Sequence, residues 1–264
     1  MFSLYFDVPQ DEQDVLIAEL WEAGVEGIVE APTGLTAFFA DTADRTALTA
    51  LFPDAVQEET EERDWVTESQ NALQPMLVGR RFFLLPEWRD DSAPDGRITI
   101  QVNSGLAFGT GAHESTRLCL EALEDLVHDG MTVIDIGTGS GILAEAAKRL
   151  GAGRVIACDI DPTAVEVARQ NFARAGLDID VFEGSATNLE NDSADLLVVN
   201  ISPEWLEMLA ADLRRIVKPR GTVLLSGIEA HDLARLQPKL EAVGLSVESI
   251  ANENQWRALR LRRR

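Results

Sequence analysis

The sequence contains few cysteines, few basic residues and no long apolar run, and each shortage excludes a class of protein. Only two of its 264 residues are cysteines, Cys119 and Cys158, and their spacing fits no metal-binding pattern. We therefore expect buried, reduced thiols, no metal site and a cytoplasmic location. No stretch approaches 18 apolar residues, and the first seven residues lack the basic start of a secretory signal. The sequence predicts neither a membrane span nor a signal peptide.

Positive charge is scarce as well. Lys and Arg together number 23 against 45 for Asp and Glu, so the formal net charge is −22. Proteins that bind nucleic acid are usually basic, and we therefore expect no direct contact with nucleic acid. The acidity either attracts basic partners or only maintains solubility, and composition leaves both interpretations open.

A glycine-rich turn organises the second half of the chain. Residues 132–136 predict a buried strand and residues 142–150 predict a helix. Three glycines join them: Gly137, Gly139 and Gly141. Without side chains, they allow a ligand to approach free backbone N–H groups and the N-terminus of the helix. The alternative is an ordinary strand-to-helix turn that binds nothing.

The residues of this turn narrow the choice of ligand. A dinucleotide-binding turn requires glycine where this chain has Ile142, and a phosphate-binding loop requires lysine after Gly141. Asp135 disfavours a pyrophosphate and suits a ligand that carries ammonium and sulfonium groups. The pattern Asp-x-Gly-x-Gly-x-Gly resembles the first motif of the class I S-adenosylmethionine-dependent methyltransferases.

An acid at the end of the next strand supports the same cofactor. Residues 154–158 predict a strand that ends at Asp159, 18 residues after Gly141. An acid about 20 residues beyond such a turn accepts hydrogen bonds from ribose hydroxyls. Asp161 ranks second, because it suits the N-cap of a helix that starts at Pro162. The two motifs together predict S-adenosyl-L-methionine as the cofactor.

The first 60 residues predict a small separate domain. The expected elements are strands at 3–8, 26–31, 35–40 and 55–61 and helices at 11–23 and 44–51. Their β-α-β-β-α-β order predicts an α+β, ferredoxin-like fold. Because it contains no set of residues suited to catalysis, we expect residues 1–62 to recognise the substrate. Residues 63–79 should then form a helical linker.

Residues 80–264 predict a larger α/β domain with a doubly wound sheet. Strands and helices alternate after Asp159, giving seven strands, the last two of which should pair antiparallel. The glycine-rich loop at 103–117 precedes the cofactor-binding strand, and we interpret it as a lid over the methionine end of the cofactor rather than a plain connector. We expect the last arginines, Arg260 and Arg262–Arg264, to form a frayed polar end.

Four motifs in order resemble one methyltransferase family. They are Gly-Leu-Ala-Phe-Gly-Thr-Gly-x-His-Glu-x-Thr at 105–116, Asp-Ile-Gly-Thr-Gly-Ser-Gly at 135–141, Asp159-Ile160-Asp161-Pro162, and Asn200-Ile201. Together they resemble the family that methylates large-subunit ribosomal protein L11, over nearly the whole chain. The resemblance implies the class I methyltransferase fold and cofactor contacts at Thr116, Gly137, Asp159 and Asn200. The predicted turn adds Gly139, and the adenine contacts stay unassigned.

The residues that follow Asn200 bear on the substrate. Relatives that methylate amides or adenine continue with Pro-Pro-Tyr/Phe, whereas this chain continues with Ile201-Ser202-Pro203 and has no aromatic clamp. The resemblance therefore implies a monomeric enzyme that methylates lysine side chains and the N-terminal α-amine of ribosomal protein L11. The alternatives are a protein-glutamine or small-molecule N-methyltransferase, and a non-catalytic scaffold in which Asn200 only caps its strand. No catalytic residue is assigned; for His113 we prefer a loop-ordering hydrogen bond to the role of base.

Overall fold

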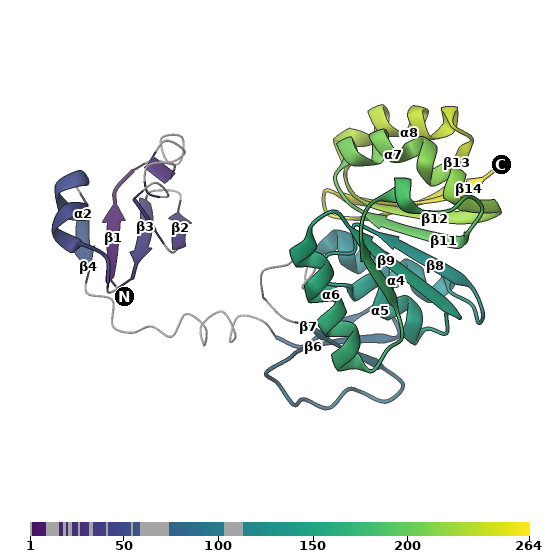
Figure 1. Ribbon diagram of the computed structural model, residues 1–264, viewed down its shortest axis with the longest axis horizontal. Coiled ribbons are helices and arrows are strands. Elements are labelled where there is room, and N and C mark those ends of the chain that lie inside the picture. Colours follow the sequence, from purple (N-terminus) through teal and green to yellow (C-terminus); the bar gives the residue numbers. More distant parts are fainter. Residues whose placement is uncertain are drawn as a thin grey trace. The chain divides into compact units, whose positions relative to one another are not determined.

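The chain divides into two compact units, Met1–Glu68 and Ser69–Arg264 (Figure 1). The structure, a computed structural model, describes residues 2–8, 16–17, 20, 23–25, 27–31, 34–40, 42–53, 55–58, 74–102 and 113–264. The predicted linker helix at 64–73 and the predicted lid up to residue 112 lie outside these ranges. No described helix has the length and apolar character needed to cross a membrane.

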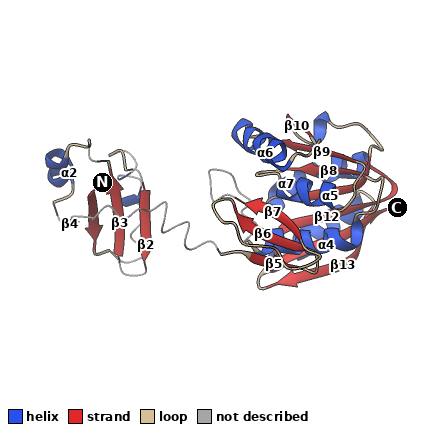
Figure 2. Ribbon diagram, turned by 90° about the horizontal axis from the view of Figure 1, so that it is seen from below, coloured by secondary structure: helices blue, strands red, loops and turns tan. Residues whose placement is uncertain are grey.

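The first unit is built on a four-stranded antiparallel sheet in the order β2-β3-β1-β4 (Figure 2). Its elements are β1 (Phe2–Phe6), β2 (Gly27–Ala31), β3 (Gly34–Phe39), α2 (Arg45–Leu51) and β4 (Val56–Glu58). Of the described residues in the predicted first helix at 11–23, Leu16, Ile17 and Leu20 are helical and Ala23 lies in a turn. Phe2, Leu4 and Phe6 alternate along β1 and join the apolar core of the unit, as residues on one face of a strand do.

A seven-stranded sheet in the order β10-β9-β8-β11-β12-β14-β13 forms the centre of the second unit (Figure 1). Its strands are β8 (Thr132–Ile136), β9 (Arg154–Asp159), β10 (Asp180–Glu183), β11 (Ala194–Asn200), β12 (Val217–Glu229), β13 (Leu245–Glu253) and β14 (Trp256–Arg263). The strands from β10 to β12 are parallel, and β14 runs antiparallel to both its neighbours. The doubly wound sheet and its antiparallel final pair were both predicted from the sequence, and both predictions are confirmed.

Helices cover both faces of this sheet. The core on one face includes residues of α4 (Glu114–Leu126), α5 (Ile142–Arg149) and α6 (Pro162–Ala175), and the core on the other face those of α7 (Pro203–Ile216) and α8 (Leu233–Ala242). Adjacent strand residues divide between the two cores: Val133 belongs to the first and Ile134 to the second. A parallel strand buried on both sides requires such a continuous apolar run, which explains why the sequence showed these strands clearly.

A smaller sheet of β5 (Met76–Val78), β6 (Phe82–Pro86) and β7 (Ile98–Val102) extends the first of these cores. Phe82, Leu84 and Ile100 are buried in the same cluster as Leu120 of α4. The end of the predicted linker at 63–79 thus contributes a strand, β5, to the second unit. Three residues are too short a run for the period-two pattern to reveal a strand.

The carboxyl-terminal arginines are not frayed, contrary to the prediction. Arg260, Arg262 and Arg263 belong to β14, where Arg262 Nε donates a hydrogen bond to Glu248 at 2.9 Å and Arg263 is bonded to Asp192 and to the Val217 carbonyl. Arg264 follows the strand, and its N–H donates to the Gly244 carbonyl at 3.1 Å. Leu259 and Leu261 alternate with Arg260 and Arg262 and anchor the strand in the core. β12 begins at Val217, and a shift in register between Ala194 and Leu196 of β11 accommodates residues 218–221.

Candidate active site

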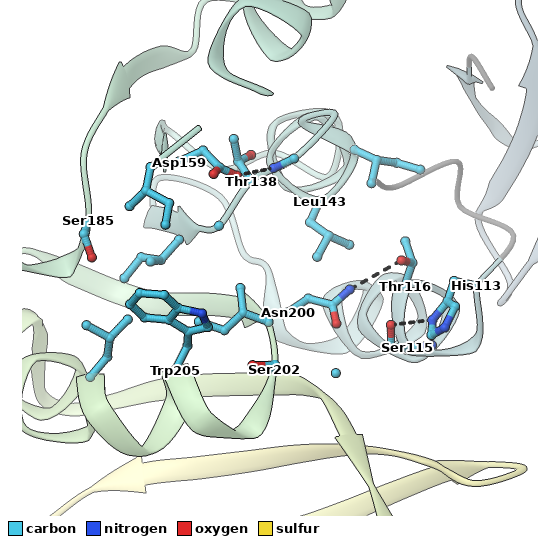
Figure 3. Close-up of a pocket in the computed structure, with 18 of the residues that line it drawn as sticks. His113, Ser115, Thr116, Thr138, Leu143, Asp159, Ser185, Asn200, Ser202 and Trp205 are labelled. Atoms are coloured by element: carbon cyan, nitrogen blue, oxygen red, sulfur yellow. Dashed lines mark hydrogen bonds between the residues drawn. The ribbon is translucent and has the colours of Figure 1, made fainter. Parts of the chain in front are cut away.

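One pocket of about 440 Å³ lies where β8, β9 and β11 end (Figure 3). All five residues predicted to contact the cofactor line it: Thr116, Gly137, Gly139, Asp159 and Asn200. They come from the start of α4, the turn after β8, the end of β9 and the end of β11. Ligands of open α/β sheets bind outside the carboxyl ends of the strands, which is the position of this pocket.

The glycine turn is held in a left-handed conformation. The φ angles of Gly137, Gly139 and Gly141 are 73°, 54° and 87°. A Cβ at Gly137 would collide with Ile201, which also lines the pocket, and a Cβ at Gly141 would lie 2.6 Å from the ring of Phe172 in α6. A side chain at position 137 would therefore change the shape of the pocket, whereas a side chain at position 141 would disrupt the packing of the turn against α6.

The N–H groups of this turn are not free, contrary to the expectation. Gly137 and Thr138 donate hydrogen bonds to the Cys158 carbonyl at 2.9 and 3.1 Å, and Gly139 donates to Asp159 at 2.9 Å. These bonds tie the turn to β9, so the turn and the acid form one rigid element. No local sequence signal predicts such bonds, because they join two segments about 20 residues apart.

Asp159 ends β9 and faces the pocket, as predicted. Its Oδ2 accepts the Gly139 N–H, and its Oδ1 accepts the N–H of Asp161 at 3.1 Å. A carboxylate oxygen accepts two hydrogen bonds, so each oxygen retains capacity for a ligand hydroxyl. Asp161 caps α6 through a 2.8 Å bond from Thr163 N–H, with Pro162 at the first helical position, which confirms the predicted N-cap.

Asp135 lies behind the turn rather than among the residues that line the pocket. Its side chain is 1% exposed, and its Oδ2 accepts a hydrogen bond from the Thr138 hydroxyl at 2.7 Å. Burial raises the pKa of Asp135 to about 7, and the neighbouring charge of Asp159 adds to that rise. That this acid suits a cationic ligand stays a prediction, and in the structure the carboxyl of Asp135 holds the turn through Thr138.

Asn200 presents an unpaired acceptor in the pocket lining. Its Nδ2 donates a long 3.4 Å hydrogen bond to the Thr116 hydroxyl, as Figure 3 shows. Its Oδ1 is buried and has no hydrogen-bond partner among the described residues. A buried acceptor without a partner costs about 1–3 kcal/mol, so this oxygen is suited to receive an N–H from a ligand.

His113 is the N-cap residue of α4. Its Nδ1 accepts the Ser115 N–H at 3.2 Å and lies 2.8 Å from the Ser115 hydroxyl. The edge of its ring packs against Trp256, with 4.5 Å between ring centroids. These contacts support the preferred, ordering role of His113. They also place the start of α4 at Glu114.

Sequence reasoning missed most of the apolar lining. The missed residues are Ile136, Ile142, Leu143, Ile160, Ile201, Trp205, Leu209 and Trp256. Trp256 lies in β14, more than 100 residues from the glycine turn, and reaches the pocket only because β14 packs beside β12. The position of Trp205 at the pocket could have been predicted from the sequence, because Trp205 occurs in the first turn of the helix that begins three residues after Asn200.

Comparisons with known proteins agree with these observations. The family model described as ribosomal protein L11 methyltransferase (PrmA) matches residues 7–264. A ribosomal protein L11 methyltransferase of Burkholderia mallei is 41% identical over 207 residues, which are 78% of this chain and 68% of that protein. One from Pelotomaculum thermopropionicum is 40% identical over 203 residues, 76% of this chain and 66% of that protein.

A solved structure shows the same fold. The crystal structure of a ribosomal protein L11 methylase from Lactobacillus delbrueckii subsp. bulgaricus matches with a TM-score of 0.69 and 31% identity. The match covers 73% of this chain and 100% of that chain. The chain therefore belongs to the ribosomal protein L11 methyltransferase family and is an S-adenosylmethionine-dependent protein methyltransferase of the class I fold.

Proposed function

We propose that this enzyme transfers methyl groups from S-adenosylmethionine to aliphatic amines of ribosomal protein L11, namely lysine side chains and the N-terminal α-amine. The observation that carries the proposal is the buried, unpaired Oδ1 of Asn200 in the same pocket as Asp159 and the glycine turn. A neutral amine offers N–H donors to such an acceptor while its lone pair remains free to attack.

The residues of the pocket fit the proposed cofactor. Its volume of about 440 Å³ lies within the usual range of small-molecule sites. Asp159 would hold the ribose hydroxyls with the lone pairs that Gly139 and Asp161 leave available. Gly137 and Gly139 allow close approach to the backbone, and Thr116 and the Nδ2 group of Asn200 would hold the amino-acid end, which leaves Asn200 Oδ1 for the amine. Bound there, the cofactor supplies an electrophilic methyl group on a sulfonium.

The residues of the chain then act mainly on the amine. A free lysine titrates near 10.4 and an α-amine near 8, so each must lose a proton before it attacks. The apolar side chains of Ile201, Trp205 and Leu209 disfavour the ammonium form and lower that cost. Asn200 would orient the neutral amine, and such positioning supplies most of the rate enhancement expected for a direct displacement.

The alternatives predict other products. A protein-glutamine methyltransferase would need a clamp for a planar amide, and Ile201-Ser202-Pro203 provides no aromatic ring for it. A small-molecule N-methyltransferase would not need a separate N-terminal unit. We propose that this unit recognises the protein substrate, and that the net charge of −22 favours a basic partner.

Mass spectrometry of ribosomal protein L11 after incubation with the enzyme and a deuterated methyl donor tests the proposal. We expect deuterated methyl groups on lysine side chains and on the N-terminal amine, at a rate that rises with pH as the amine loses its proton. Asn200→Ala should lower kcat for the amine by about 100-fold, the scale of a lost positioning contact. Methyl groups on glutamine, or an unmodified protein, would contradict the proposed substrate.

A further inference from the structure

Two large apolar side chains on α7 remain exposed beside the pocket. Trp205 is 45% exposed and Met208 is 68% exposed. Residues three apart on a helix share a face, so the two side chains form one apolar ridge, which we call the α7 ridge. Trp205 also lines the pocket, whereas Met208 lies beyond it. The ridge therefore continues the pocket wall outward along the helix.

The acidic residues next to Trp205 and Met208 on α7 are already paired with basic residues of α8. Glu204 and Glu207 pair with Arg235 of α8 at 3.1 and 2.9 Å, and Glu207 also pairs with Lys239. These ion pairs join the acidic residues of α7 to α8. They leave Trp205 and Met208 as the side chains that α7 offers to an outside partner.

The position of the ridge separates it from ordinary exposed apolar residues. Other large exposed hydrophobic side chains of the described structure, such as Leu77 and Ile250, lie on strands away from the pocket. Single exposed residues of that kind need no explanation. Trp205 and the 59% exposed Ile160 instead both line the pocket, and Met208 lies about one turn along α7 from Trp205. A small ligand inside the pocket would leave Met208 exposed.

We infer that the α7 ridge binds the polypeptide segment that flanks the amine being methylated. This inference rests on the proposed function and names the surface that receives its substrate. A lysine side chain that enters the pocket keeps its own backbone at the opening, where the ridge begins. Trp and Met are enriched at protein interfaces, and the flexible thioether of Met208 adapts to unlike sequences. The fitting partner is a basic segment with an apolar side chain near its lysine, because the enzyme carries a net charge of −22.

Steady-state kinetics of the full-length Met208→Ala variant test the inference. We expect the KM for ribosomal protein L11 to rise about 5- to 10-fold, on the scale of one lost apolar contact. The kcat and the calorimetric affinity for S-adenosylmethionine should stay at wild-type values. Met208→Lys should raise the KM further, because a like charge repels a basic segment. Ile250→Ala, a matched exposed site on β13, should change none of these quantities.

Three results would overturn the inference. An unchanged KM in Met208→Ala and Met208→Lys would show that the substrate does not cross the ridge. A matching loss of cofactor affinity would assign Met208 to the cofactor instead. A wild-type enzyme that dimerises through the ridge, shown by a Met208-dependent change in sedimentation, would make the ridge a contact between copies. If the wild-type enzyme leaves ribosomal protein L11 unmodified, the proposed function itself fails, and that result is distinct from all three.

Discussion

The two units of this chain differ in the kinds of side chain that they bury. In the first unit, the buried side chains of the described core are almost all apolar, with Phe2, Leu4 and Phe39 among the largest. The second unit also buries polar groups that its own residues leave unpaired, among them Asp135 Oδ1 and Asn200 Oδ1. Both of these residues lie at the ends of neighbouring strands. Unpaired buried polar groups oppose folding, so Asn200, which lines the pocket, keeps an acceptor that serves a ligand rather than stability.

This contrast indicates a division of labour. The first unit has a sheet packed into a core of its own. The second unit carries the five residues predicted to contact the cofactor and has two cores, one on each side of its sheet. Because each unit has its own core, one unit can be altered or removed while the other stays folded. This independence can be tested.

Removal of the first unit should produce the largest effect. A chain of residues 69–264 retains β5 and the pocket, so its affinity for S-adenosylmethionine should equal that of the full chain. Methylation of ribosomal protein L11 should fall by at least about 100-fold, because the recognition unit no longer raises the local substrate concentration. Calorimetry and a methyl-transfer assay measure the two quantities. Removal up to residue 80 is less informative, because it deletes β5, which pairs with β6.

Either of two results would break this comparison. Normal methylation by residues 69–264 would place substrate recognition in the second unit alone. Loss of cofactor binding would show that the second unit depends on the first. Methylation of a short lysine peptide serves as the control, since such a peptide has little surface for a separate unit to recognise.

Gly137→Val should abolish cofactor binding while the first unit stays folded. The new side chain would collide with Ile201 and displace it toward the pocket that both residues line. We expect a loss of at least about 100-fold in affinity, equivalent to about 3 kcal/mol. Gly176→Val is the matched control, because Gly176 has a similar φ of 65° but open space around its Cβ position. Wild-type cofactor affinity in Gly137→Val would show that Gly137 is not required for cofactor binding and has only a structural role.

Asp135→Asn should change how the stability of the second unit depends on pH. Burial raises the pKa of Asp135 from 3.8 to about 7, so the folded protein keeps a proton that the unfolded chain loses in this interval. The stability that this group provides is fully present below pH 3.8 and is lost as the pH rises to about 7. The neutral amide removes that loss, so the variant should gain about 1.4 kcal/mol over wild type for each pH unit.

Chemical denaturation, followed by tryptophan fluorescence at several pH values between 4 and 7, measures this difference. All carboxylates other than Asp135 are common to both proteins, so their contributions cancel in the comparison. A difference between the two proteins that stays constant with pH would contradict a buried, protonated Asp135.

Asp159→Ala should weaken cofactor binding by about 1.5–3 kcal/mol, the range for a hydrogen bond to a charged group. Part of this loss reflects the turn, because Asp159 also holds the N–H of Gly139. Asp161→Ala is the control within the same segment: it removes the N-cap of α6 at a cost of about 1 kcal/mol in stability and should leave cofactor affinity intact. An unchanged affinity in Asp159→Ala, measured by calorimetry, would remove Asp159 from the site.

Sequence reasoning succeeded where a local pattern has one physical cause. The run at 132–136 can be buried on both faces only as a central strand, and Asp161-Pro162 has the composition of a helix start. It failed where the cause is distant. The arginines of β14 look solvated in the sequence, yet buried leucines between them and the paired acids Glu248 and Asp192 fix them in a sheet.

The sequence by itself therefore predicted the doubly wound sheet and the five residues that the structure brings together in one pocket. Spacing along one chain specifies these features, since the carboxyl ends of successive parallel strands meet at one edge. Only the tertiary structure showed that Trp256 lines the pocket and that N–H groups of the glycine turn donate to β9. It also showed that Asp135 is buried, which raises its pKa. Burial and cross-strand contacts depend on which distant segments pack together, and no local pattern encodes that packing.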